Sequence, residues 1–225
     1  MKVSISLGGS LLTRDMSPEN YRMYAKALRD LRERGHQIVV VCGGGRPARE
    51  YIKLAKELGA GPETQDRLGI LATHVNALLL IAALGQAAHP HVHRRTSEVR
   101  RNLDEKILVG GGHQPGSSTD YRAVLFAEVM GADLIVNATD CGGVFNKDPR
   151  KHPDARQYGH MSFGQLEELI KGRFTQAPGD YGLFDLKAVR RARRCGIPLI
   201  IIDGTDPEEI IRAVEGGHSG TEIRG

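Results

Sequence analysis

IVVVCGGGRPARE, residues 38–50, is an apolar strand pattern that ends in three glycines and passes directly into a helical pattern. The same order recurs in KVSISLGGSLL, residues 2–12, and in KILVGGGHQPGSSTD, residues 106–120. In an α/β sheet, ligands bind outside the carboxyl ends of the strands, where helix N-termini also point. Three glycine clusters at one sheet edge therefore predict a site for a polyphosphate or for two phosphorylated ligands.

The pair Gly8 and Gly9, taken alone, is equally compatible with a plain structural turn. Glycine has no Cβ, so the chain can turn tightly there and bring its amides close to a ligand. A P-loop is excluded, because that motif requires G-x-x-x-x-G-K-[ST] and no lysine follows these glycines within reach.

Strand and helix patterns alternate along the chain, which predicts an α/β fold with a mostly parallel sheet covered on both faces. The first helix has clear ends, with Ser17 as N-cap, Pro18 at the first helical position and Gly35 just past the last turn. Strands are expected at 2–7, 37–42, 106–110, 133–138 and 198–202. Helices are expected at 18–31, 46–58, 66–84, 119–130, 162–171, 184–195 and 206–215. The turn-rich stretches 139–160 and 172–182 are expected to form loops, the first a long loop or hairpin over a ligand.

The composition favours a small anionic ligand over nucleic acid. A chain of 225 residues suits one domain, and its 28 glycines are concentrated in the loops described above. The formal net charge of +4 comes from scattered arginines, and RRARR at 190–194 is interpreted as a solvated helix face.

The sequence predicts a cytoplasmic protein without a membrane segment. Cys42, Cys141 and Cys195 have neither disulfide nor zinc spacing, which fits a reducing compartment. The chain enters its first strand without a signal-peptide pattern, and the longest apolar run, residues 77–85, is too short to span a bilayer.

Several polar residues next to the glycine clusters are candidates for ligand binding. Arg46 and Arg49 lie three residues apart in the first turn of a helix whose amide end favours anions, and Arg49 is the stronger candidate. The hydroxyls of Ser117, Ser118 and Thr119 open the next helix, where capping and phosphate or base recognition are equally compatible with the pattern.

Other candidates have competing structural interpretations. Asp66 opens the long apolar helix and is either a cap or a ligand contact, Asp185 has the same two interpretations, and Asp140 and Asp148 can position Mg²⁺ or a nucleotide. His89, His91 and His93 share one face of a strand, but a structural role is favoured over metal binding because no carboxylate or cysteine pattern accompanies them.

Together these residues place anion-binding groups on both sides of a cleft that lacks an obvious nucleophile. Phosphoryl transfer needs this arrangement, because positioning and charge neutralisation supply most of its catalysis. An acceptor that is itself a phosphate has an oxygen already ionised near pH 7, so no general base is required. The pattern therefore predicts a kinase that acts on a monophosphate.

The motifs also resemble a known family. SLGGSLL, VVVCGGGRPAREYIKLAKELGA, DRLGILATHVNALLLIAAL, GGHQPGSSTD, ATDCGGVFNKDPRKHPDA and DGTDPEEIIRAVEGGHSGTEI occur in this order over essentially all 225 residues. They are similar to the amino-acid kinase superfamily and, within it, to the archaeal type of uridylate (UMP) kinases.

This resemblance implies a single three-layer α/β/α domain that transfers the γ-phosphate of ATP to UMP with Mg²⁺, in a homohexamer built as a trimer of dimers. The acceptor side is expected at about 1–130 and the ATP side at about 131–225. The resemblance assigns the ATP phosphates and the transferred group to Gly9, Ser10, Gly45 and Arg49, of which Arg49, Ser10 and Gly9 are the catalytic candidates. It assigns UMP to Gly44 and Asp66, with Gln114, Pro115, Gly116, Ser117, Ser118, Thr119 and Asp120 around the uracil and phosphate. The ATP nucleoside is assigned to Thr139, Phe145 and Asp148, with Asp140 beside them, and no residue is assigned as a direct metal ligand.

The chain departs from the family pattern at a few positions. Gly142 replaces an aspartate, His74 stands where arginine is frequent, and Tyr121 and Arg122 replace small residues on the acceptor side. Two alternatives to a UMP kinase stay open on the sequence: a kinase of the same fold for another small phosphate or a carboxylate, and a non-catalytic nucleotide- or oxyanion-binding protein.

Overall fold

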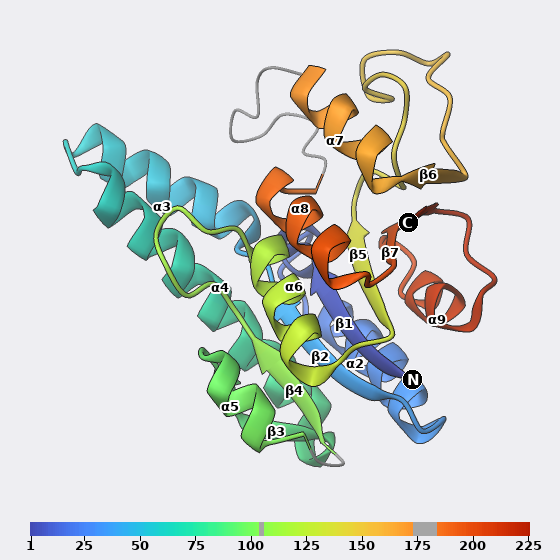
Figure 1. The fold of residues 1–225 in the computed structure, drawn as a ribbon. Helices are drawn as coiled ribbons and strands as arrows, with labels where there is room; N and C mark the ends of the chain where they lie inside the picture. The colour runs from blue at the N-terminus through green and yellow to red at the C-terminus, as the bar shows by residue number, and fades with distance from the viewer. Residues whose placement is uncertain (104–105, 173–183) are drawn as a thin grey trace.

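The computed structural model describes residues 1–103, 106–172 and 184–225, and its centre is one sheet of eight strands (Figure 1). The strand order is β3-β4-β2-β1-β5-β7-β8-β6, and β7 pairs with β8 as the antiparallel neighbour in an otherwise parallel sheet. The strands are β1 (Lys2–Leu7), β2 (Gln37–Cys42), β3 (Ala88–His93), β4 (Ile107–Gly110), β5 (Leu134–Thr139), β6 (His160–Ser162), β7 (Leu199–Asp203) and β8 (Thr221–Arg224).

Helices cover both faces of this sheet, which confirms the predicted α/β architecture. Over one face pack α2, α4 and α9, and over the other pack α5, α6, α7 and α8. The helices are α1 (Gly9–Leu12), α2 (Pro18–Glu33), α3 (Gly45–Glu57), α4 (Pro62–Leu84), α5 (Thr96–Arg101), α6 (Thr119–Met130), α7 (Phe163–Gly172), α8 (Leu186–Cys195) and α9 (Glu208–Glu215), with a 3₁₀ turn η1 (Gly85–Ala87).

The alternation of side chains along β1 divides the core between the two faces. Val3, Ile5 and Leu7 belong to the cluster under α2 and α4. The intervening Ser4 and Ser6 are also buried, and each hydroxyl donates to α6: Ser4 to the Ala123 carbonyl at 2.8 Å and Ser6 to the Asp120 carboxylate at 2.7 Å. Buried hydroxyls need such partners, so these two bonds hold α6 in register on β1.

The structure corrects some element boundaries. The long helix α4 begins at Pro62 with Gly61 as N-cap, so Asp66 lies in its second turn and is not a cap. Strands β6 and β8 were not predicted, because three or four residues at a sheet edge carry too little periodicity. The predicted hairpin within 139–160 is confirmed by an antiparallel bridge between Phe145 and Gln157, whereas the second loop, 172–182, falls almost wholly outside the described residues.

Helix α4 is longer than the apolar run at 77–85 suggested. By length and composition the segment Pro62–Ala87 is sufficient to cross a membrane, with a mean hydropathy of 1.9 over its most apolar window. It packs against α2, α3 and β3 and contains buried, hydrogen-bonded Thr73, His74 and Asn76, so it is a partly buried helix of the protein core.

Candidate functional site

The first two glycine clusters touch each other at the carboxyl ends of β1 and β2. A Cβ added to Gly9 would lie 2.1 Å from the Gly45 amide nitrogen and 2.5 Å from the Gly43 carbonyl carbon. Gly45 has a φ of +66°, and a Cβ there would lie 2.3 Å from the Gly9 carbonyl oxygen. Both positions therefore need glycine, because backbone atoms fill the space that a side chain would take.

Side chains from α4 and the segment after α1 hold these glycine turns in place. Asn76 donates to the carbonyls of Gly43 at 2.7 Å and Gly44 at 3.2 Å. Thr13 donates to the Gly9 carbonyl at 2.8 Å and accepts the Arg46 amide at 3.3 Å.

The amides of the two glycine turns remain available. Among the described residues, none accepts a hydrogen bond from the N–H groups of Gly9, Ser10, Gly44 or Gly45. These amides lie at the starts of α1 and α3, and such N–H groups, together with the positive end of the α3 dipole, favour an anion.

Arg46 and Arg49 differ in their partners within the protein. Arg46 forms a surface ion pair with Glu50 at 2.6 Å, whereas Arg49 has neither a hydrogen bond nor an ion pair with any residue that the structure describes. Since α3 begins at the triple glycine, the side chain of Arg49, unpaired among the described residues, lies near the end of this helix that favours anions.

The third glycine segment, residues 110–118, closes over the start of α4. Asp66 accepts the Gly116 amide at 2.7 Å, although the two residues are 50 positions apart in the sequence. Thr73 accepts the Gly112 amide at 2.8 Å, and the His74 Nε2 lies 2.7 Å from the Gly112 carbonyl, so His74 donates there as the Nε2–H tautomer. Asp66 thus meets the predicted acceptor loop, which we define as Gln114–Asp120.

The acceptor loop ends in a network of hydroxyls and carboxylates. Ser118 is the N-cap of α6, accepts the Tyr121 amide at 3.0 Å and donates to Asp185 at 2.6 Å. Asp185 in turn caps α8 by accepting the Lys187 amide at 2.7 Å. Ser118 and Asp185 are therefore caps, as one of the two predicted interpretations stated, and their mutual bond ties the loop to α8.

Within this network, Asp120 is the residue whose pKa is clearly shifted by its surroundings. Burial raises the pKa of Asp120 to about 6, and the charge of Asp185 adds to the rise while the hydrogen bond from Ser6 opposes it. Its partner Ser6 lies two residues before Gly8, so Asp120 links the acceptor loop to the first glycine turn.

The residues predicted for the ATP nucleoside continue the site along β5. The Gly8 amide donates to the Ala138 carbonyl at 2.9 Å, so Thr139 follows directly beside the first glycine turn. Phe145 lies in the hairpin, and Asp140 is exposed at its start. Asp148 faces a basic turn: burial acts against its charged form, but hydrogen bonds from Arg150 outweigh this and lower the pKa of the carboxyl. Among the described residues, the side chain of Asp148 pairs with Arg150 and Lys151 and not with the glycine turns.

Several residues that shape the site were not predicted from the sequence. Asn76, Thr73 and Thr13 position the glycine turns, and Asp203 ends β7 beside β5, where it accepts the amide and hydroxyl of Thr205 at 2.9 and 2.6 Å. A polar residue within the apolar pattern of α4 was the available signal for Asn76 and Thr73. For Asp203 the available signal was its position as the first residue of a DGT turn, directly after the predicted strand 198–202.

Of the three histidines of β3, His93 has structural hydrogen-bond partners. His93 is buried, with Nδ1 3.3 Å from the Val109 carbonyl and Nε2 3.1 Å from the Asn102 amide nitrogen, and His91 is exposed. Both ring nitrogens of His93 are therefore engaged, and no group of three metal-ligating side chains occurs in the described part of the chain.

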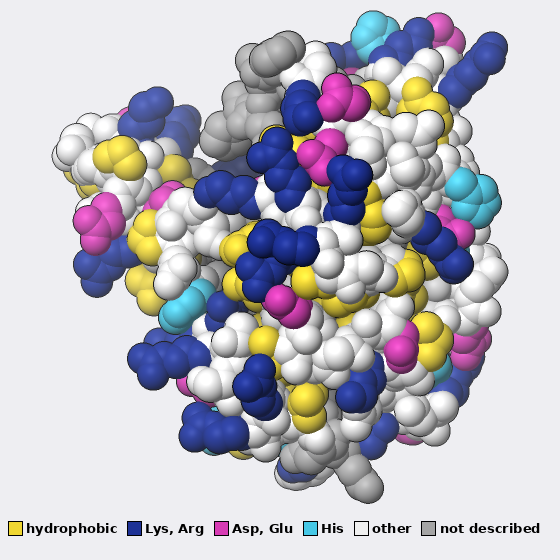
Figure 2. Space-filling model, viewed as in Figure 1, with side chains coloured by type: hydrophobic (Ala, Val, Ile, Leu, Met, Phe, Trp, Pro, Cys, Tyr) yellow, Lys and Arg dark blue, Asp and Glu magenta, His cyan; other side chains and the backbone are white. Residues whose placement is uncertain are grey.

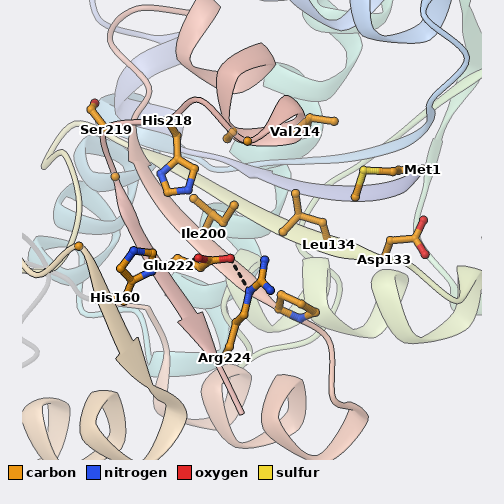
Figure 3. Close-up of a pocket in the computed structure, with 15 residues that line it drawn as sticks. Met1, Asp133, Leu134, His160, Ile200, Val214, His218, Ser219, Glu222 and Arg224 are labelled. Carbon is orange, nitrogen blue, oxygen red and sulfur yellow. Dashed lines mark ion pairs between the residues drawn. The ribbon is translucent and has the colours of Figure 1, made fainter.

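A cavity of about 570 Å³ lies at the opposite end of the sheet, near Met1 and the amino ends of β5 and β7 (Figure 3). Glu222 pairs with His160 at 3.0 Å and with Arg224, and Asp133 accepts the Lys2 amide at 2.7 Å. None of the predicted site residues lines it.

Comparison with known proteins identifies the family of this chain. The sequence model of the amino acid kinase family matches residues 1–203. The chain belongs to the amino acid kinase family.

Uridylate kinases are among the members of this family that are similar to the chain. The similarity extends over nearly the full length of both proteins. The uridylate kinase of Methanothermobacter thermautotrophicus is 42% identical over 217 residues, covering 96% of each chain. That of Methanobrevibacter smithii is 38% identical and covers 99% of each chain. The crystal structure of uridylate kinase from Archaeoglobus fulgidus has a TM-score of 0.89 at 39% identity, covering 99% of this chain and 100% of that one.

Proposed function

We propose that this protein is an ATP-dependent UMP kinase that converts UMP to UDP by in-line phosphoryl transfer. A bond from the ATP γ-phosphorus to its bridging oxygen breaks, a bond from that phosphorus to a UMP phosphate oxygen forms, and ADP leaves. The observation that carries the proposal is the meeting of the two glycine turns with the acceptor loop across β1. The full-length uridylate kinase relatives support the same reaction.

The phosphate side of the site rests on Gly9, Ser10, Gly45 and Arg49. Backbone amides fixed by Thr13 and Asn76 cost no reorganisation when charge moves to the transferred group, and Arg49 neutralises part of that charge. Thr139, Asp140, Phe145 and Asp148 hold the ATP nucleoside in this proposal.

The acceptor side rests on Gly44, Asp66 and the acceptor loop. One carboxylate oxygen of Asp66 accepts from ribose hydroxyls, and the other retains the hydrogen bond from the Gly116 amide. The acceptor loop surrounds the uracil and phosphate. The phosphate of UMP is already ionised near pH 7, so the reaction does not require a general base.

Mg²⁺ is held mainly by phosphate oxygens in this proposal. No three candidate ligand side chains converge among residues 1–103, 106–172 and 184–225, which fits the ion's habit of binding through substrate phosphates with one or two carboxylates. Asp140 and Asp148 are the carboxylates that would position the ion, which when bound would neutralise charge that develops on the leaving group. The acceptor half, about 1–130, and the ATP half, about 131–225, belong to one domain of a cytoplasmic enzyme.

We infer further that the protein is a homo-oligomer, a hexamer built as a trimer of dimers. Helices α3 and α4 extend together beyond the sheet (Figure 1). Each carries an exposed apolar stripe with helical spacing: Tyr51, Leu54 and Leu58 on α3, and Leu71, Val75, Leu78 and Leu79 on α4. Stripes of this kind are typical of an interface, and we assign a second copy of the chain to them.

Arg49→Ala is the first test of the reaction. We expect its kcat for ADP release from ATP and UMP to fall by about 100-fold or more, because a cation is lost from the transferred phosphate. Arg46→Ala is the matched control on the same helix turn and is expected to stay within about twofold, since a surface ion pair contributes little. Equal losses in both variants would contradict the assignment of Arg49.

Asp66→Asn tests the acceptor side. With UMP, CMP, dTMP, AMP and isopentenyl phosphate as separate acceptors, we expect turnover selective for UMP. The variant should raise KM for UMP by about tenfold while KM for ATP stays unchanged, because one charge-assisted hydrogen bond to the acceptor is weakened. A rise in KM for ATP alone would show that Asp66 contacts ATP and not UMP, which contradicts the assignment.

A further inference from the structure

A groove separate from the glycine turns lies between α5 and α6, and we call it the α5–α6 groove. It has a volume of about 620 Å³. Its lining includes Arg95 and Arg100 of the α5 region, His113 and Gln114 before the acceptor loop, Arg122 of α6 and Arg191 of α8. Figure 2 shows Lys and Arg side chains gathered over α6 and α8 on this face.

Arg122 is the unusual residue in this groove. Its exposed fraction is 5%, and its Nε and Nη2 atoms are buried without a hydrogen-bond partner among the described residues. The guanidinium carbon lies 4.5 Å from the centre of the Phe126 ring. A cation–π contact contributes about 0.5–2 kcal/mol, which is less than the penalty for burying a charge whose donors are unpaired.

The carboxylates near Arg122 are occupied elsewhere. Glu98 attracts Arg122, but its Oε2 already accepts the amides of Arg94 at 2.7 Å and Arg95 at 3.1 Å. Glu128 lines the groove and is paired with Arg191 at 2.5 Å. Burial lowers the pKa of Arg122 to about 10, so the side chain is still charged at neutral pH.

The remaining charge of the groove is positive. Arg95 and Arg100 line it without an ion-pair partner in the part of the chain that the structure describes. A planar guanidinium with free donors matches the oxygens of a phosphate group, which it binds in a bidentate manner. The volume exceeds that of a single inorganic anion and lies within the range of small-molecule sites.

We propose that the α5–α6 groove binds a phosphorylated small molecule with at least two negative charges, whose phosphate oxygens pair with the buried guanidinium of Arg122 while Arg95 and Arg100 neutralise the rest. This site shares none of the glycine-turn residues and does not include Arg49. Gln114 belongs to both the groove and the acceptor loop, so the two sites are neighbours.

The test uses inorganic pyrophosphate as the probe and measures its binding by equilibrium dialysis. The protein carries Arg49→Ala, which weakens binding at the glycine turns. We expect saturable binding in this background and at least tenfold weaker binding after Arg122→Met is added. Without ligand, Arg122→Met should raise the melting temperature, because it removes an unpartnered buried charge and keeps the volume. Pyrophosphate should raise the melting temperature of the wild type more than that of Arg122→Met.

Two further variants test the groove without changing the buried Arg122, so they remain informative if Arg122→Met folds poorly. Arg100→Gln, on the exposed rim, should weaken pyrophosphate binding at least threefold without changing the ligand-free melting temperature. Arg101→Met removes the same charge from a neighbour that does not line the groove and should leave binding within twofold. Unchanged pyrophosphate binding in the Arg122 and Arg100 variants would overturn the proposal. If their sedimentation mass also changed, the groove would be a contact between subunits.

Discussion

Asp120 shows how one residue couples stability to the site. Its pKa is raised from the ordinary value of 3.8 to about 6, so the folded state favours the protonated carboxyl. The unfolded chain then loses this proton first, and stability falls as pH rises from about 4 to about 6 and levels off above that. We expect Asp120→Asn to stabilise the ligand-free protein by about 2 kcal/mol at pH 8 and by almost nothing at pH 4, measured by urea unfolding.

Asp154→Asn provides the opposite case, because the Lys147 hydrogen bond lowers the pKa of this exposed carboxyl. It should bring no gain in stability at pH 8. A gain for Asp120→Asn that was independent of pH would show that the cause is packing and not ionisation.

At the scale of elements, the site depends on the close approach of two strand-to-helix turns. A Cβ on Gly9 would lie 2.1 Å from a backbone nitrogen of the second turn, where no flexible side chain can move aside. Gly9→Ala is therefore expected to destabilise the protein by several kcal/mol and to reduce kcat by about 100-fold or more, since the amides of both turns move apart. Thermal unfolding and ADP release measure the two effects.

Gly61→Ala is the control for that substitution. Gly61 caps α4 with a φ of −70°, and an added Cβ there would meet nothing within 4 Å. Activity and melting temperature should be close to those of the wild type. If Gly9→Ala behaved in the same way, the two turns would not need their close approach.

At the scale of the whole molecule, the apolar stripes of α3 and α4 predict assembly. Leu54→Glu combined with Leu78→Glu places charges on both stripes, and we expect a smaller mass by sedimentation velocity. Met23→Glu on α2, at a side chain that is 45% exposed outside the stripes, should leave the mass unchanged. The same mass for both proteins would remove α3 and α4 from the interface.

Much of the fold was predictable because its signals are local. Apolar or alternating patterns of three to five residues that end in glycine marked β1, β2 and β4. Ser17 and Ser118 marked helix starts, where a hydroxyl satisfies a free amide within three positions. The Arg46–Glu50 ion pair is also local, because Glu50 lies one helical turn after Arg46, but it was not predicted.

The rest of the site was decided by tertiary structure. The strand order places β1 between β2 and β5, and no pattern within a strand records its neighbours. That order brings Asp66 to Gly116, Asn76 to the second glycine turn and Asp120 to Ser6, across separations of 32 to 114 positions. The sequence by itself therefore determined the central strands β1, β2, β4, β5 and β7, the glycine turns and the expectation of a phosphorylated ligand, because these depend on residues next to each other in the chain. The burial of Arg122 and the positioning contacts depend on which elements pack together, and only the folded structure decides that.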